Sequence, residues 1–228
     1  MRRPQRPTPA GKFVTLEGGE GAGKTTQIKL LAGALKTAGV DAVVTREPGG
    51  APNAESIRAL LVEGATNRWR PMTEALLNYA ARLEHVETTV KPALSEGRWV
   101  LSDRFADSTV AYQGYGHDLG AETIKRLHRL VLGEFQPDLT IILDVPVEQG
   151  LERAAGRADK ASAREDRYER MNQAFHQRLR DGYLDIARRD PERCAVVDAT
   201  RDKAAVHEWI CTLVHNRLGV KLAGAQKP

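Results

Sequence analysis

A glycine-rich segment near the start of the chain combines residue types and spacing that could bind phosphate groups. It fits the pattern G-x-x-x-x-G-K-[ST] with Gly18, Gly19, Glu20, Gly21, Ala22, Gly23, Lys24 and Thr25. Glycines let backbone N–H groups turn toward phosphate oxygens, and a following helix adds partial positive charge. We expect Lys24 to reach the β and γ phosphates of a nucleoside triphosphate and Thr25 to bind Mg²⁺. Together with Thr26, the segment predicts a site for ATP and Mg²⁺, but it does not distinguish a kinase from a GTPase or a motor ATPase.

Charged residues around two later apolar runs could bind a second phosphate group. Arg46 and Arg104 each follow such a run, and Arg82 lies in a helical pattern between them. Guanidinium groups offer forked donors that match the oxygens of a phosphate monoester. Asp103 ends the run before Arg104, where a carboxylate could hold a water bound to Mg²⁺. The sequence contains neither a guanine-specifying N-K-x-D nor an L-S-G-G-Q-like pattern, which favours a small-molecule kinase.

Strands and helices must hold these residues together. Five short runs rich in β-branched residues are predicted strands: Lys12–Glu17, Asp41–Thr45, Trp99–Asp103, Thr140–Val145 and Ala195–Asp198. Between them, apolar residues recur at helical spacing, as in Ile28, Leu31, Leu35 and Ala38, in Leu76, Ala80 and Leu83, and in Met171, Phe175, Leu179, Tyr183 and Ile186. The alternation predicts an α/β fold with a parallel sheet, whose ligands bind at the carboxyl ends of the strands.

Length and composition indicate one globular unit. The chain has 228 residues, of which 41% are hydrophobic and 28% are charged. We expect a single domain over residues 12–218, with flexible tails at 1–11 and 219–228. The charged stretch after the fourth predicted strand is interpreted as a lid, at about residues 153–167.

Partners are constrained by charge, hydropathy and cysteine spacing. The net charge is +4, but basic and acidic residues are interleaved, so a nucleic-acid partner is not expected. The sequence shows no membrane-spanning run and no signal peptide, which predicts a cytoplasmic protein with no membrane partner. Cys194 and Cys211 lie in apolar surroundings and are predicted to be buried thiols.

From the glycine-rich loop onward the chain resembles the thymidylate kinase family, over most of residues 12–215. The segment Asp103–Gln113 is similar to the family pattern D-R-[FYH]-x-x-S-x-x-A-[FY]. The block Thr45–Gly50 reads T-R-E-P-G-G, and Tyr79–Arg82 is similar to the family's F-x-x-x-R helix. The resemblance implies a P-loop NTPase fold with a five-stranded parallel sheet, helices on both faces and a small helical lid. It also implies phosphoryl transfer from MgATP to dTMP, giving dTDP and ADP, by a homodimer.

The resemblance also implies roles for individual residues. Glu20 would lie close to the acceptor's 3′-hydroxyl, and Tyr112 would pack on its sugar. Lys24, Arg104, Asp103 and Arg157 would be catalytic, and Thr25 and Asp103 would hold Mg²⁺. The other acceptor-binding residues would be Arg46, Glu47, Pro48, Asn78, Tyr79, Arg82, Arg104, Ser108, Thr109 and Gln113.

Two positions depart from the family pattern. Family members usually carry Phe four residues before the helix arginine, where its ring stacks on thymine, whereas this chain has Asn78. Tyr79 or Phe105 could supply a ring instead, or Asn78 could hydrogen-bond the base edge. Some relatives carry Arg in the loop where this chain has Gly21, so we expect the missing cation to come from the lid. The favoured lid residues are Arg153, Arg157 and Arg167, and Lys160 and Arg164 are also candidates.

The sequence leaves alternative functions open. Asn78 keeps a kinase for another monophosphate, such as UMP or CMP, possible. The basic composition allows a nucleic-acid-stimulated ATPase. A catalytically dead nucleotide-binding module is disfavoured because Lys24, Thr25 and Asp103 are all present.

Overall fold

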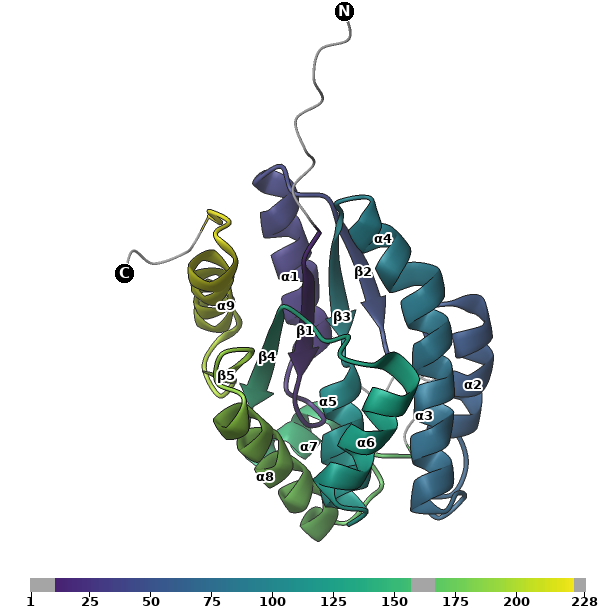
Figure 1. The fold of residues 1–228 in the computed structure, drawn as a ribbon. Coiled ribbons are helices and arrows are strands. Elements are labelled where there is room, and N and C mark those ends of the chain that lie inside the picture. Colours follow the sequence, from purple (N-terminus) through teal and green to yellow (C-terminus); the bar gives the residue numbers. More distant parts are fainter. Residues whose placement is uncertain (1–10, 157–166, 224–228) are drawn as a thin grey trace, which may run out of the picture.

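The computed structural model describes residues 11–156 and 167–223 and contains a five-stranded parallel sheet (Figure 1). Its strands are β1 (Phe13–Glu17), β2 (Ala42–Arg46), β3 (Trp99–Asp103), β4 (Leu139–Asp144) and β5 (Cys194–Asp198), in the order β2-β3-β1-β4-β5. All five predicted strands are present, with ends that differ by one residue at most. Because the strands are parallel, their carboxyl ends share one edge of the sheet, where Leu16 lies opposite Asp103.

Helices cover both faces of the sheet. The helices α1 (Lys24–Thr37) and α9 (Lys203–Leu218) pack on one face, and α4 (Lys91–Ser95) and α8 (Gln173–Arg189) pack on the other, where α5 (Ala106–Thr109) contacts α8. Successive strand residues point to opposite faces, so Val14 and Leu16 join the α1 side of the core while Phe13 joins the α4 side. This arrangement confirms the predicted α/β fold.

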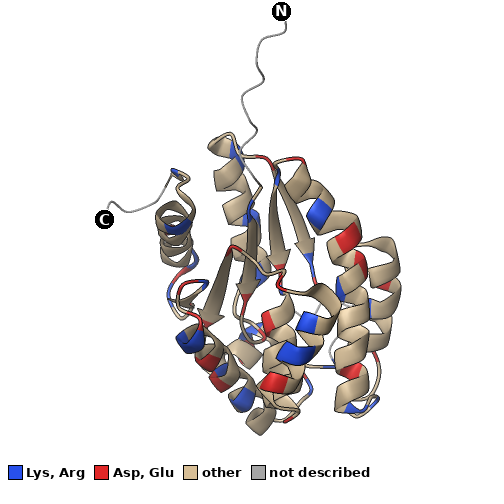
Figure 2. Cartoon of the chain, viewed as in Figure 1, with Lys and Arg blue, Asp and Glu red and all other residues tan. Residues whose placement is uncertain are grey.

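The remaining helical segments are α2 (Pro52–Val62), α3 (Pro71–His85), the π-helical segments η1 (Val86–Val90) and η2 (Val110–Gly116), α6 (Ala121–Leu132) and α7 (Val147–Ala155). Most of them lie toward the carboxyl ends of the strands, as the labels of α2, α3, α6 and α7 show (Figure 1). Figure 2 shows basic and acidic residues side by side on α6 and α8 rather than gathered by sign. Within the described residues, no helix is long and apolar enough to cross a membrane.

Helix α3 is present as predicted, but the face that it buries is not the predicted one. Leu76, Ala80 and Leu83 are exposed, whereas Glu74 and Arg82 are buried. The reason is that the inward face of α3 mixes apolar residues with charged ones that have partners, and apolar spacing alone cannot identify such a face. Helix α8 follows the pattern, since Phe175, Leu179, Tyr183 and Ile186 are buried.

Some predicted features lie outside the described residues. Arg157, Lys160 and Arg164, which belong to the predicted lid, lie outside them, as do residues 1–10 and 224–228 of the predicted tails. Both cysteines are free and buried, as predicted.

Candidate functional site

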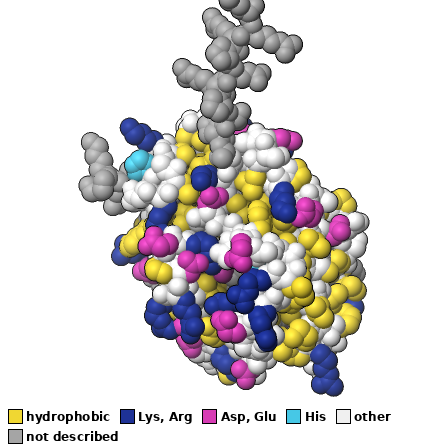
Figure 3. All heavy atoms as spheres, viewed as in Figure 1, with side chains coloured by type: hydrophobic (Ala, Val, Ile, Leu, Met, Phe, Trp, Pro, Cys, Tyr) yellow, Lys and Arg dark blue, Asp and Glu magenta, His cyan; other side chains and the backbone are white. Residues whose placement is uncertain are grey.

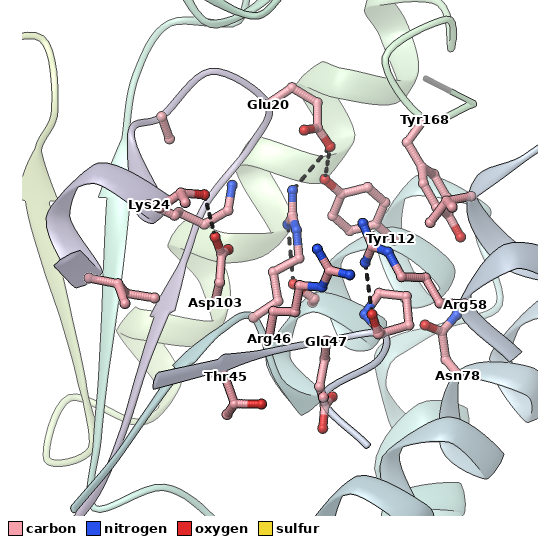
Figure 4. A pocket seen from close by; sticks show the side chains of 18 of the residues that line it. Glu20, Lys24, Thr45, Arg46, Glu47, Arg58, Asn78, Asp103, Tyr112 and Tyr168 are labelled. Carbon is pink, nitrogen blue, oxygen red and sulfur yellow. Dashed lines mark hydrogen bonds and ion pairs between the residues drawn. The ribbon is translucent and has the colours of Figure 1, made fainter. Parts of the chain in front are cut away.

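A cavity of about 770 Å³ opens at the carboxyl edge of the sheet (Figure 4). It is lined by the glycine-rich loop, the ends of β2 and β3, and residues of α2, α3 and η2. The volume lies in the range of a small-molecule site. Among predicted site residues, those that line it are Glu20, Gly21, Ala22, Gly23, Lys24, Thr25, Arg46, Glu47, Pro48, Asn78, Asp103, Arg104, Ser108, Thr109, Tyr112 and Gln113.

The glycine-rich loop joins β1 directly to α1, and its shape requires Gly21. The φ angle of Gly21 is 69°, and a Cβ placed there would lie 1.9 Å from the carbonyl oxygen of Gly150 on α7. An L-residue would also be strained at this φ. The cation that some relatives carry at this position therefore cannot be accommodated without moving α7. Gly18 and Gly19 line a second, smaller pocket between the loop and α7.

Lys24, Thr25 and Asp103 meet at the mouth of the loop. The Lys24 ammonium donates to the carbonyl oxygens of Gly18 at 3.1 Å and Gly19 at 2.9 Å. Burial and the neighbouring Arg104 lower the pKa of Lys24 to about 8. The Thr25 hydroxyl donates to the Asp103 carboxylate at 2.6 Å, so the two residues predicted to hold a metal are brought together.

Arg104 lies at the centre of the cavity wall, in a left-handed backbone conformation with φ of 73°. Its Nη1 donates to the Gly18 carbonyl oxygen at 3.0 Å, to Tyr183 at 3.1 Å and to Ser108 at 3.2 Å. Its Nη2 donates to Glu20 at 3.0 Å. Left-handed backbone is costly for a non-glycine residue and often marks a functional position. The geometry fixes the guanidinium between the loop and the cavity.

Glu20 is held as a carboxylate. Burial acts to raise its pKa, but Arg104 and Lys24 outweigh it and, with a hydrogen bond from Tyr112, lower the pKa of Glu20 to about 2. The ring of Tyr112 lies under the guanidinium of Arg104, 4.9 Å from the ring centroid to Cζ. Glu20, Arg104 and Tyr112 therefore form one rigid group, of which Figure 4 labels Glu20 and Tyr112.

A buried ion-pair network supports the block after β2. Arg82 donates from Nε to Glu47 at 2.7 Å, and His85 contacts the other oxygen of Glu47 at 2.9 Å. Arg82 Nη2 donates to the Phe105 carbonyl oxygen and to Thr109. Its Nη1 is buried without a partner among the described residues. Arg82 does not line the cavity wall itself, although Glu47 and Thr109 do.

Arg46 reaches the cavity from the end of β2. Its guanidinium pairs with Glu55 on α2 at 3.0 Å, and the other oxygen of Glu55 accepts from the Gly50 backbone N–H at 2.9 Å. One turn later on α2, Arg58 also lines the cavity and donates to the Pro48 carbonyl oxygen at 2.7 Å. Sequence reasoning missed Arg58, although a single cation inside the apolar run of α2 was a usable signal.

The aromatic side chains near Asn78 are not arranged as predicted. Tyr79 is 1% exposed and Phe105 is 0% exposed, and neither lines the cavity, so neither ring can replace the missing one. Both pack in the core because the buried guanidinium of Arg82 lies over their faces. Asn78 does line the cavity, and its amide nitrogen donates to the Glu74 carbonyl oxygen at 2.9 Å. A second ring that lines the cavity, besides that of Tyr112, belongs to Tyr168, which sequence reasoning missed.

The described lid arginines make contacts away from the loop. Arg167 is 0% exposed and donates to the carbonyl oxygens of Leu61, Ala65 and Thr66 and to Glu74. Arg153 donates to the carbonyl oxygens of Ala199 at 2.8 Å and Thr200 at 3.4 Å. Neither lines the cavity, because each guanidinium is engaged by backbone oxygens elsewhere. Thr26, on the first turn of α1, also lies outside the cavity wall.

Comparison with known proteins gives the family. The thymidylate kinase family model matches residues 16–210. The thymidylate kinase of Caulobacter vibrioides is 55% identical over 92% of this chain and 99% of its own. The chain belongs to the thymidylate kinase family. A thymidylate kinase of Geobacter sulfurreducens is 48% identical over 91% of this chain and 98% of its own. The crystal structure of the thymidylate kinase from Ehrlichia chaffeensis has a TM-score of 0.70 at 36% identity, covering 90% of this chain and 99% of that one.

Family membership confirms the resemblance inferred from the motifs. The matched region contains the glycine-rich loop from Gly18, the block after β2 and the segment after β3. The same motifs border the cavity in the structure, although they are far apart in the sequence. The thymidylate kinase family, and with it the P-loop NTPase fold, is therefore established for this chain.

Proposed function

We propose that this protein transfers the terminal phosphoryl group of MgATP to dTMP, giving dTDP and ADP. The observation that carries the proposal is one cavity bordered on one side by the glycine-rich loop and on the other by the motifs that follow β2 and β3. A triphosphate on the loop and a monophosphate beside Arg104 would then face each other. Catalysis would come from positioning and charge stabilisation, because an ionised acceptor phosphate needs no strong base.

The donor side would be organised by the loop. Its backbone N–H groups and Lys24 would hold the phosphates, and Lys24 would exchange its bonds to Gly18 and Gly19 for phosphate oxygens. The hydroxyl of Thr25 and the carboxylate of Asp103, 2.6 Å apart, are oxygen donors of the kind that Mg²⁺ prefers, so the residues present fit this ion. When bound, Mg²⁺ would neutralise charge on the β and γ phosphates.

On the acceptor side, Arg104 and Arg46 would bind the monophosphate, with Arg58 as a third cation. Glu20, held ionised, would accept a hydrogen bond from the acceptor's 3′-hydroxyl. Tyr112 would pack on the sugar, where its bond to Glu20 fixes the ring.

The base would lie toward α3. Asn78, Gln113 and Tyr168 line that part of the cavity. Tyr168 lies edge-on to Tyr112, with centroids 5.1 Å apart. We assign to Tyr168 the ring contact that Asn78 cannot make.

We propose that residues 153–167 form a lid that closes over ATP. Arg153 and Arg157 would supply positive charge to the phosphates, for which Arg153 would exchange its bond to the Ala199 carbonyl oxygen. The buried contacts of Arg167 support a role in anchoring the end of this segment. Arg157 lies outside the described residues.

We propose that the protein is a cytoplasmic homodimer formed through α3. Figure 3 shows hydrophobic side chains gathered over the side of the molecule formed by α2 and α3. Met72, Leu76 and Leu83 on α3 are 40%, 51% and 38% exposed. An apolar stripe of this kind on one helix is suited to a self-complementary two-fold interface.

A panel of monophosphates in a coupled ADP assay tests the proposed reaction. We expect turnover with dTMP to exceed turnover with UMP and CMP, and little ADP to form without an acceptor. Comparable rates with all three would contradict dTMP specificity, and ADP formation stimulated by DNA without any monophosphate would favour the ATPase alternative.

Lys24→Ala is the control for this assay. We expect it to lower kcat by about two to three orders of magnitude, the usual effect of removing a group that stabilises developing charge. Lys29, which also lines the cavity on α1 but lies beyond the loop, offers a matched variant. Lys29→Ala should lower kcat far less than Lys24→Ala.

A further inference from the structure

A buried carboxylate lies directly before the glycine-rich loop and is not used by the proposed mechanism. Glu17, the last residue of β1, is 0% exposed. Its Oε1 accepts from the Phe105 backbone N–H at 2.7 Å, and its Oε2 accepts from Ser108 at 2.6 Å and from Tyr183 at 3.2 Å. Burying a carboxylate is unfavourable unless its contacts compensate, so its presence calls for an explanation.

The two hydroxyl groups that donate to Glu17 also accept from Arg104. Nη1 of Arg104 donates to Ser108 at 3.2 Å and to Tyr183 at 3.1 Å. A hydroxyl has one hydrogen to donate and two lone pairs to accept. The two hydroxyl oxygens also lie 2.8 Å apart, so the hydrogen of Tyr183 can go to Ser108 instead of Glu17. In either arrangement Ser108 donates to Glu17, and each hydroxyl oxygen keeps a lone pair that can face the guanidinium.

We propose that ionised Glu17 is a positioning residue for Arg104, acting through the hydroxyl groups of Ser108 and Tyr183. A protonated Glu17 brings a third hydrogen into the cluster, so the hydroxyls have fewer acceptors for their own hydrogens. It also removes the negative charge that complements Arg104. Either change weakens the hold on a guanidinium that borders the cavity, and the inference rests on the proposed role of Arg104 in binding the acceptor phosphate.

The surroundings of Glu17 make its charge sensitive to pH near neutrality. Burial, followed by the like charge of Asp107, raises the pKa of Glu17 to about 7, against the lowering effects of Ser108, Arg104 and Phe105. The titratable and charged groups that face it come from every element around it: Lys24 on α1, Arg82 on α3, Arg104 after β3, Asp107 on α5, Tyr183 on α8 and Cys194 on β5.

The test compares the wild-type enzyme with Glu17→Gln, which keeps the shape of the side chain but cannot be ionised. KM for dTMP and kcat are measured from about pH 6 to about pH 8.5, the interval that spans this titration. We expect the KM of Glu17→Gln to exceed the wild-type KM about tenfold at the alkaline end and to approach it at the acidic end. Ionisation of dTMP affects both proteins equally and cancels from the ratio of the two KM values.

A ratio of KM values that does not change with pH would overturn the proposal. If the wild-type enzyme does not phosphorylate dTMP at all, the proposed function fails instead, so the two failures are distinguishable. If Glu17→Gln does not fold, Tyr183→Phe takes its place, because it removes one of the two relaying hydroxyls and keeps the ring. Its KM ratio to wild type should also fall toward the acidic end, and a flat ratio would contradict the proposal.

The double variant separates a relay from independent effects. If Glu17 acts on Arg104 through Tyr183, Glu17→Gln combined with Tyr183→Phe should raise KM by less than the product of the two single effects. Multiplicative effects would contradict the relay. Thermal melts of each variant at the same pH values serve to show that KM differences arise in folded protein.

Discussion

At the scale of single residues, Asn78 is the position where this chain departs most from its family. Its side chain lines the cavity but offers no ring to stack on a base. We predict that Asn78→Phe lowers KM for dTMP about tenfold, because stacking one base on an aromatic ring contributes about 1 to 3 kcal/mol. Steady-state kinetics with dTMP measure the effect.

Asn78→Ala is the matched control, since it removes the amide without adding a ring. We expect its KM for dTMP to be equal to or higher than that of the wild type. If Asn78→Phe also has a higher KM for dTMP than the wild type, the amide of Asn78, rather than Tyr168, holds the base.

The arginines that we place around the acceptor phosphate differ in how easily they could be predicted from the sequence. Arg46 and Arg104 could be assigned to the cavity because each stands at the end of a strand inside a family motif. Arg58 was missed because a cation in an apolar helical run is more often a surface residue, and only the fold of α2 turns it toward Pro48. Arg167 was predicted to face phosphate because the run of residues 166–169 resembles the D-R-x-E run that follows the lid in the family, but the carbonyl groups that bury it belong to residues about 100 positions earlier.

At the scale of elements, the contact between the loop and α7 leads to a prediction about Gly21. A Cβ at Gly21 would collide with the backbone of Gly150, which cannot rotate away as a side chain could. We predict that Gly21→Ala destabilises the fold by about 1 to 3 kcal/mol, the usual cost of overpacking, measured by urea denaturation. A Cβ at Gly19 would meet nothing within 4 Å. Gly19→Ala should therefore leave the midpoint of urea unfolding nearly unchanged. If both variants shift this midpoint equally, the steric argument is contradicted.

The buried pair of Glu74 and Arg167 connects α3 to the segment after the lid. Glu74 also accepts from Gln113 at 2.6 Å, so the pair reaches η2 as well. We predict that Arg167→Ala destabilises the protein by about 3 to 5 kcal/mol, because the buried carboxylate of Glu74 loses its guanidinium partner and keeps Gln113 and His117 among its contacts. Replacing both partners, with Glu74→Gln and Arg167→Met, should restore part of the lost free energy of unfolding. Thermal or urea unfolding measures it. No recovery would show that the carbonyl contacts of Arg167, rather than the charge pair, carry the stability.

The positions of the helices and strands were easier to predict than the faces that they bury. Strand ends could be assigned to within one residue because apolar β-branched runs stop where polar residues begin. The inward face of α3 could not, because its partners Glu47, Gln113 and Arg167 come from three distant segments. For the same reason the burial of Tyr79 and Phe105 was not foreseen, since the cation that covers both rings is contributed by Arg82.

At the scale of the whole molecule, Glu17 makes stability depend on pH. Its pKa is raised from 4.5 to about 7 in the folded state, so the folded protein binds more protons than the unfolded chain between these values. Stability from this group is therefore highest below about pH 4.5 and falls as the pH rises toward 7, by about 3 kcal/mol at most. We predict that urea midpoints of the wild type fall relative to those of Glu17→Gln across this interval. A difference that stays constant with pH would contradict the raised pKa.

The proposed dimer can be tested by placing charge on the exposed stripe of α3. We predict that Leu76→Glu combined with Leu83→Glu converts the dimer to a monomer, as measured by sedimentation velocity, because burying two carboxylates in an apolar interface is unfavourable. Trp209 on α9 is similarly exposed, at 43%, but packs near the other face of the sheet. Trp209→Glu should leave the oligomeric state unchanged. A wild-type protein that sediments as a monomer would contradict the proposal.

The central position of β1 has a consequence for how the protein is made. β1 is completed within the first 17 residues, yet its neighbours in the sheet are β3 and β4, which end at residues 103 and 144. Ribosomes add about 5 to 20 residues per second, so the first strand waits on the order of 10 s for both of its partners. During translation the glycine-rich loop therefore has no sheet to anchor it. A nascent chain that stops short of β4 would carry the phosphate-binding motif without the neighbouring strand that holds it in place.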